Sequence, residues 1–310
     1  MNRGNATAAV LTAFLFFRTC LAADTVRGTW AIEPTGKTGT VELSLQLEPG
    51  IYEFNDERAW ATRELHGLDV STVARHDVRF AIDRDAGIVT LRGSLEAGKG
   101  GGVFDFLPSR QYARELTLLG ATISNAGEQL AMLACDVSLQ FVREMHDLQV
   151  SPLTPGILLA FRVRDVDAKF VRDLRAAGLP AHNSGTLVAL RIQHMTPELV
   201  QAYHREGINP DDALLIAMKT QRVTPEWIHE FTRVGYGPVP AGDLIAFRIH
   251  GVSADMVSKL RKLGYPNPAP GLLIAMRIDD VTPEYIAGLQ ARGINGLSLG
   301  ELITRHIQEP

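Results

Sequence analysis

Two short stretches contain residue types that enzymes use, and each lacks a partner that its chemistry requires. His229-Glu230 begins the zinc-peptidase pattern His-Glu-x-x-His, which needs a second histidine one helical turn later, but that position is Arg233. Residues 93–100 (GSLEAGKG) have the glycine and lysine spacing of a phosphate-binding loop, yet Gly100 stands in place of the hydroxyl residue that holds magnesium. A β-hairpin is the better interpretation of this stretch. We therefore expect no catalytic residue, no metal site and no cofactor.

A different chemistry is suggested by one basic residue that recurs in the C-terminal half of the chain. This basic column consists of Arg162, Arg191, Lys219, Arg248 and Arg277. Seven residues after four of its members stands an acid: Glu198, Glu226, Asp255 and Glu284. One interpretation is a ladder of exposed ion pairs, each worth about 0 to 1 kcal/mol. The other is a partner-binding stripe that receives an acidic peptide or a C-terminus. The sequence leaves both open.

The basic column belongs to a repeat of about 29 residues. A glycine recurs in steps of 29, 28, 29 and 29 residues, at Gly178, Gly207, Gly235, Gly264 and Gly293. The period extends back through Gln149 to Gly120, which gives seven units. Eleven residues before each of these positions is a residue suited to cap a helix start: Ser109, Ser138, Asp167, Thr196, Thr224, Ser253 and Thr282. Such a fixed period predicts a stack of helical units.

Each unit has two predicted helices. The first, about three turns long, carries two apolar columns that we expect to be buried. One column is Tyr112, Phe141, Phe170, Leu199, Trp227, Met256 and Tyr285. The other is Leu116, Met145, Leu174, Tyr203, Phe231, Leu260 and Leu289. The second helix is more apolar and is recognised at residues 158–163, 187–192, 215–220, 244–249, 273–278 and 302–307. Residues 108–310 are therefore predicted to form an α-solenoid of about seven 29-residue helical hairpins.

Residues 24–107 show the alternation of half-buried strands instead. Val41, Leu43, Leu45 and Leu47 alternate with polar residues, and turn clusters, one of them at residues 98–102, separate this run from similar ones. This predicts a small antiparallel β domain with one solvated face. The expected fold class is α+β, with the β domain preceding the solenoid.

The N-terminal 23 residues resemble a secretory signal. Arg3 precedes an apolar run that is shorter than a membrane-spanning helix, and small residues follow it. An uncleaved anchor is the alternative. Cleavage would leave Cys135 as the only cysteine, with no internal disulfide and no membrane span, in a periplasmic or extracellular protein. The net charge of −4 favours neither nucleic acid nor an anionic membrane as a partner.

Two stretches of the repeat carry a family resemblance. Residues 281–307 (VTPEYIAGLQARGINGLSLGELITRHI) and 252–278 (VSADMVSKLRKLGYPNPAPGLLIAMRI) resemble the helical repeats that trail the membrane zinc-peptidase domain of β-lactam-sensor-type bacterial proteins. Secreted relatives combine a small β domain with such repeats, and residues 98–120 resemble their junction. The resemblance covers about residues 28–308. The family's peptidase residues have no counterpart here, so the resemblance does not imply proteolysis.

The sequence thus predicts a secreted, non-enzymatic scaffold that binds a protein or peptide along its helical repeats. Solenoids present extended surfaces suited to this task. The alternative is an enzyme or small-ligand carrier with a site in the β domain or at the junction, near residues 104–112.

Overall fold

The computed structural model describes residues 25–47, 53–54 and 59–308. The chain divides after Arg110 into two compact units, the first formed by strands and the second by helices. The expected fold class, α+β, is confirmed. The predicted signal segment, residues 1–23, lies outside the described residues, so secretion stays a prediction.

The first unit is one antiparallel sheet in the order β3–β2–β1–β7–β6–β5, with β4 also pairing with β2. The strands are β1 (Val26–Pro34), β2 (Thr40–Leu47), β3 (Glu53–Phe54), β4 (Trp60–Ala61), β5 (His76–Arg84), β6 (Gly87–Glu96) and β7 (Lys99–Pro108), and a 3-10 helix follows β4 at Thr62–Glu64. Val41, Leu43, Leu45 and Leu47 of β2 are buried, and the residues between them are exposed or half-buried. The predicted alternation is confirmed.

Residues 93–100 form a hairpin rather than a phosphate-binding loop. The turn between β6 and β7 consists of Ala97 and Gly98, with φ values of 50° and 78°. The turn expected over residues 98–102 is therefore too long, because its last three glycines pair within β7. A Cβ atom on Gly102 would lie 2.0 Å from a backbone oxygen of β6. Only glycine allows the two strands to approach this closely.

The second unit contains fourteen described helices, each nine or ten residues long. The odd-numbered helices, here the A row, are α1 (Arg110–Leu118), α3 (Leu139–Asp147), α5 (Ala168–Ala176), α7 (Pro197–Arg205), α9 (Pro225–Arg233), α11 (Ala254–Lys262) and α13 (Pro283–Ala291). The even-numbered helices, the B row, are α2 (Ala126–Ala134), α4 (Pro155–Val163), α6 (Ser184–Ile192), α8 (Asp212–Thr220), α10 (Ala241–His250), α12 (Pro270–Ile278) and α14 (Leu299–Gln308).

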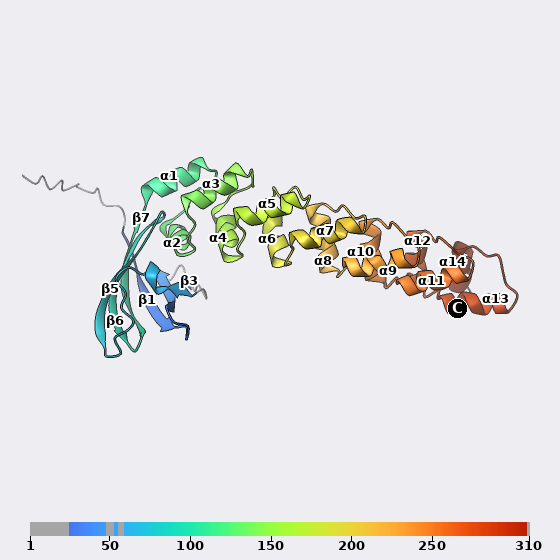
Figure 1. The fold of residues 1–310 in the computed structure, drawn as a ribbon, viewed down its shortest axis with the longest axis horizontal. Helices are drawn as coiled ribbons and strands as arrows, with labels where there is room; N and C mark the ends of the chain where they lie inside the picture. The colour runs from blue at the N-terminus through green and yellow to red at the C-terminus, as the bar shows by residue number, and fades with distance from the viewer. Residues whose placement is uncertain (1–24, 48–52, 55–58, 309–310) are drawn as a thin grey trace, which may run out of the picture. The chain divides into compact units, whose positions relative to one another are not determined.

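Successive helices of each row pack against one another. In the B row this contact runs from α2 through every even-numbered helix to α14. In the A row it joins α3 to α5, α5 to α7, α9 to α11 and α11 to α13. Figure 1 shows the A row above the B row from α3 to α6 and below it from α11 to α14, so the rows wind around each other within this unit. The arrangement is the solenoid of seven helical hairpins that the repeat predicts.

Both rows share one local frame, counted from the residue before each helix as position 0. In the A row the position-0 side chain accepts a hydrogen bond from a backbone amide of the first turn, as predicted, at Ser138, Asp167, Thr196, Thr224, Ser253 and Thr282. The B row has the same bond, which the sequence did not reveal, at Asn125, Thr154, Asn183 and Asp211.

Position 11 of the frame, just after each helix, has a positive φ. In the A row it holds the predicted series Gly120, Gln149, Gly178, Gly207, Gly235, Gly264 and Gly293. In the B row it holds Asp136, Asp165, His194, Arg222, Gly251 and Asp280. This left-handed residue ends each helix. The 29-residue unit is therefore two copies of one shorter capped helix.

The core of the solenoid is built from positions 4 and 7. In the A row from α3 onward these are Val142 and Met145, Val171 and Leu174, Val200 and Tyr203, Ile228 and Phe231, Val257 and Leu260, and Ile286 and Leu289. In the B row from α4 to α12 they are Leu158 and Phe161, Leu187 and Leu190, Leu215 and Met218, Leu244 and Phe247, and Leu273 and Met276. The predicted column that includes Leu116 and Leu289 is confirmed. The column that begins at Tyr112 occupies position 3, and it is only half-buried at Leu199, Trp227 and Tyr285.

Candidate functional site

The basic column occupies position 8 of the B helices and reaches back to the preceding B helix. Arg162 Nε donates to the Cys135 carbonyl at 3.1 Å. Arg191 Nε donates to the Arg164 carbonyl at 3.1 Å. Each acceptor carbonyl lies at a helix C-terminus, where backbone oxygens lack helical partners and a positive side chain is favourable. Arg277 Nε makes the corresponding bond at 3.3 Å, to the carbonyl of the last residue of α10.

Three arginines of the column also cover a ring at position 3 of the A helix in the same unit. The guanidinium carbon lies 5.3 Å from the ring centroid for Arg162 over Phe141, and 4.8 Å for Arg191 over Phe170. Trp227 is covered in the same way, at 4.8 Å, by the arginine of α10. Such contacts are worth about 0.5 to 1 kcal/mol at exposed sites.

The predicted ladder of ion pairs with acids seven residues later is wrong for the residues that the structure describes. Within them, the one ion pair of the basic column joins Arg162 Nη2 to Asp136 Oδ2 at 2.9 Å, which is an acid of the preceding turn. Lys219 lies near the expected acid, Glu226, without an ion pair. The pKa of Glu226 is lowered first by its own backbone amide, then by the Thr224 hydroxyl, and also by the Lys219 charge.

In the A row, the side chain at position 8 also donates to a carbonyl at the C-terminus of the preceding helix of its row. This shared contact gives position 8 a structural role. Arg175 Nη2 donates to the Leu148 carbonyl at 2.6 Å. Gln290 Nε2 donates to the Leu263 carbonyl at 3.0 Å. A neutral side chain therefore serves as well as a charged one at this position. Because both rows share these bonds, the basic column by itself does not mark a binding face.

The two rows differ on their outer faces, and the B row has an exposed aliphatic side chain at position 9. We call this set the apolar row; it consists of Val163, Ile192, Ile249, Ile278 and Ile307, and these side chains are 49% to 62% exposed. Thr220 takes the same place in α8. Monomeric proteins rarely expose large contiguous apolar patches, and such patches mark interaction sites.

The rest of the B-row outer face is small or aliphatic. Position 6 is alanine and half-buried at Ala160, Ala189, Ala217, Ala246 and Ala275. Position 2 is an exposed glycine at Gly156, Gly185, Gly242 and Gly271. At three of these glycines an added Cβ would meet no atom within 4 Å, so packing inside the chain does not require them. The surface of the outer face is therefore lower at these glycine and alanine positions than at the exposed aliphatic side chains.

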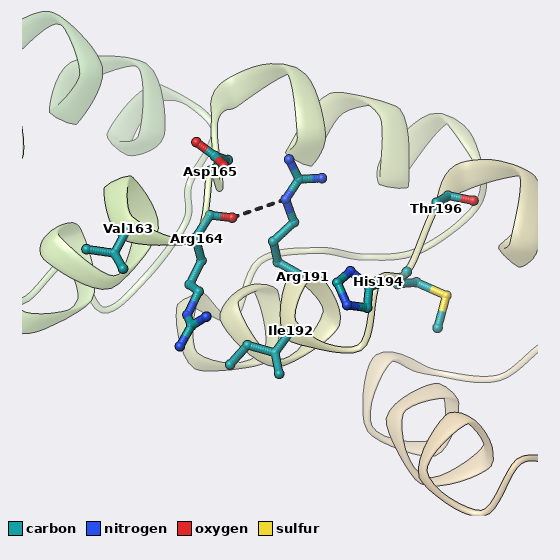
Figure 2. Close-up of a pocket in the computed structure, with 8 residues that line it drawn as sticks. Val163, Arg164, Asp165, Arg191, Ile192, His194 and Thr196 are labelled. Carbon is teal, nitrogen blue, oxygen red and sulfur yellow. Dashed lines mark hydrogen bonds between the residues drawn. The ribbon is translucent and has the colours of Figure 1, made fainter. Parts of the chain in front are cut away.

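The basic column and the apolar row meet in a hollow of about 460 Å³ at the C-terminal ends of α4 and α6. Its walls include Val163 and Ile192 of the apolar row, and Arg164, Arg191 and His194. Figure 2 shows these side chains around the hydrogen bond from Arg191 to the Arg164 carbonyl. The hollow combines aliphatic surface with guanidinium donors, which suits a ligand with an aliphatic group and a carboxylate.

A second hollow of about 310 Å³ surrounds Arg277 but has balanced charges. Lys259 Nζ lies 3.0 Å from Asp255 Oδ2 and 3.0 Å from Glu284 Oε1. The pKa of Glu284 is lowered, chiefly by the hydrogen bond from Lys259. The first hollow has one acidic residue in its wall, Asp165, so the excess positive charge lies toward α4 and α6.

The first unit has a hollow of its own, of about 540 Å³, on the sheet around Gly28. Arg27 and Arg92 both contact the carboxylate of Asp105 in its wall. A Cβ on Gly28 would lie 2.5 Å from the ring of Phe104, so this ring occupies the space that a side chain at position 28 would need. The two guanidinium groups already share the carboxylate of Asp105, which is the one acidic side chain described in the wall.

Comparison of the chain with protein-family models, with curated proteins and with solved structures gives no match. The resemblance to helical repeats of sensor-type proteins therefore stays a prediction. Within the described part of the chain, no group of three or more His, Cys, Asp or Glu side chains is placed to hold a metal ion. No described helix is long and apolar enough to cross a membrane. Cys135 is buried, as expected of a small apolar residue.

The sequence missed the apolar row, although its signal is present. The six B helices from α4 to α14 end with the same pattern, a basic residue followed by a β-branched one, except that α14 has histidine at the first place. The extra apolar content of these helices predicts packing against neighbours on two sides, which the contacts between successive B helices bear out. The side chains at positions 4 and 7 make the contacts between neighbouring B helices. The additional aliphatic side chain at position 9 is therefore left exposed.

Proposed function

We propose that the protein is a non-enzymatic scaffold that binds a protein or peptide through the outer face of the B row. The single observation that carries this proposal is the apolar row, which repeats on five helices and stays exposed. These side chains are already about half-buried, so burying the rest of each one in a complex contributes roughly 1 kcal/mol. A monomer gains nothing from a series of exposed aliphatic side chains, whereas a binding surface does.

The size of the face fits this function. Each B helix is about 14 Å long, and packed helices lie about 9 Å apart. Six helices from α4 to α14 therefore offer on the order of 700 Å², close to the roughly 800 Å² that each partner contributes to a standard interface.

The location proposed for this activity is the periplasm or the extracellular space. The support comes from residues 1–23, whose basic start, short apolar run and small residues resemble a secretory signal. N-terminal sequencing of the protein purified from its native host tests the proposal. A mature chain that begins near Asp24 supports secretion, and one that retains Met1 contradicts it.

The binding proposal is tested by capture of partners from an envelope extract. The wild-type chain is compared with the double variant Ile192→Asp/Ile249→Asp, and with the control Leu118→Asp, which changes an 84% exposed aliphatic residue of the A row. We expect a reproducible partner for the wild type and the control and none for the double variant. Equal capture by all three proteins rules out the apolar row as the binding face.

A small-ligand carrier or enzyme with a site in the first unit is the second candidate. The hollow around Gly28, with Arg27, Arg92 and Asp105 in its wall, is the observation that favours it. Screening small carboxylates by isothermal titration with the wild type and Arg92→Ala tests it. Binding that is lost in Arg92→Ala favours the carrier over the scaffold, and an absence of heat with every compound removes this candidate.

A further inference from the structure

The charge around the apolar row indicates what kind of partner it receives. At the C-terminal ends of α4 to α10 the surface carries Arg164, Arg191, Arg222 and Arg248, and no ion pair within the described residues involves any of them. Three of the four are exposed. Guanidinium groups pair strongly with carboxylates, so a complementary partner is acidic along this edge.

The spacing of the row indicates the partner's secondary structure. Neighbouring B helices lie about 9 Å apart, so the exposed aliphatic side chains repeat at about that interval. An α-helix repeats the same face every seven residues, or about 10.5 Å. A β-strand repeats it every ~6.7 Å or ~13 Å, which matches poorly. A polyproline segment repeats at about 9 Å but is recognised by aromatic grooves, and the exposed row is aliphatic.

We propose, on the basis of the scaffold function above, that the B row binds an acidic amphipathic α-helix of a partner protein. Its aliphatic side chains, spaced seven residues apart, lie between Val163, Ile192 and their counterparts along the row. Its carboxylates on one flank pair with Arg164 and Arg222, and one carboxylate enters the hollow beside His194. The low glycine and alanine positions of the B face let the bound helix approach closely.

The test uses synthetic probes and the full chain. The first probe is a labelled peptide of about 21 residues, long enough to cross three B helices, with leucines at heptad spacing and glutamates on one flank. The second has the same composition with leucines at alternate positions, and the third has glutamine in place of glutamate. Fluorescence anisotropy gives the affinity of each probe.

We expect the heptad probe to bind at least about tenfold more tightly than the alternating probe, because only its aliphatic side chains match the row. The glutamine probe is expected to bind roughly fivefold more weakly than the glutamate probe. The charge-reversal variant Arg164→Glu/Arg222→Glu should lose that preference and prefer a lysine version of the probe. Neither side chain makes a described hydrogen bond, so the fold is expected to tolerate the change.

Several outcomes overturn this proposal. One is equal binding of the heptad and alternating probes, and another is no loss on replacing glutamate by glutamine. A third is a dimer of the full chain, seen by light scattering, that Ile249→Asp dissociates, because a second copy then covers the row. If no probe binds but capture from extract still depends on Ile192 and Ile249, the helix proposal fails while the scaffold function stands. If capture does not depend on them, the scaffold function itself fails.

Discussion

The A row and the B row have the same frame and opposite outer faces. In both rows most helices follow a residue whose side chain caps the first turn, positions 4 and 7 are buried, and position 8 holds the preceding helix terminus. The A row then presents charged residues outward, such as Lys169, Arg172 and Arg233, and the B row presents the apolar row. The shared frame would allow the outer faces of both rows to be polar. Because the fold does not require the apolar face of the B row, we expect function there.

The largest expected effect tests whether the two rows share one core. Phe231 of α9 and Phe247 of α10 are both buried, with ring centroids 5.6 Å apart. Phe231→Ala and Phe247→Ala should each lower the free energy of unfolding by about 3 to 5 kcal/mol, through lost burial and the cavity left behind. Urea denaturation measures both. If one of the two variants lowers the free energy of unfolding by less than about 1 kcal/mol, the two rows do not contribute equally to the core.

Substitutions at position 11, which ends each helix, should change the free energy of unfolding by a smaller amount and with opposite signs in the two rows. Gly207 of the A row has a φ of 77° with open space around its Cβ position, so Gly207→Ala should destabilise by about 1 to 2 kcal/mol. Arg222 of the B row has a φ of 56°, so Arg222→Gly should stabilise by roughly 0.5 kcal/mol, since glycine removes the strain but adds unfolded-state entropy. Thermal unfolding measures both signs, and the same sign in both rows argues against the shared frame.

Helix caps provide the next comparison. The Thr224 side chain accepts a hydrogen bond from the Trp227 amide at 3.3 Å, so Thr224→Ala should cost about 1 kcal/mol. Ala269 begins α12 without a side-chain cap, so Ala269→Ser should gain about 0.5 kcal/mol. Chemical denaturation of the two variants beside the wild type checks the pair. If Ala269→Ser lowers the free energy of unfolding, the start of α12 differs from the A-row starts in more than its cap residue.

The smallest effect depends on pH and belongs to the B row. Burial raises the pKa of Asp212 above its ordinary value of 3.8, in opposition to the hydrogen bond from the Ala181 amide. Because the folded pKa is raised, the protonated form favours folding, and stability is lost as pH rises from 3.8 through the folded pKa. Asp212→Asn should therefore be more stable than the wild type at neutral pH. Denaturation at a series of pH values should show that this gain in stability disappears below pH 3.8. If the gain persists below pH 3.8, it has another cause than the charge of Asp212.

Local chemistry explains which features the sequence predicts well. A cap such as Thr282 and a stop such as Gly293 act on their own helix, so their spacing predicts the A row directly. The contacts of Arg191 depend on the rise of the stack, which brings residues 27 positions apart into contact, so the sequence alone assigns it to the wrong partner. The exposure of Ile192 depends on which positions the neighbouring helices cover, and hydrophobicity alone assigns such a residue to the core.

The central claim is that the apolar row binds a partner and does not stabilise the fold. The most direct measurement compares capture and stability in one set of proteins: the wild type, Ile192→Asp/Ile249→Asp and Leu118→Asp. We expect the free energy of unfolding to stay within about 0.5 kcal/mol in both variants, because all three positions are exposed. Capture should be lost only in the Ile192→Asp/Ile249→Asp variant. Loss of stability in that variant, or undiminished capture, would contradict the account.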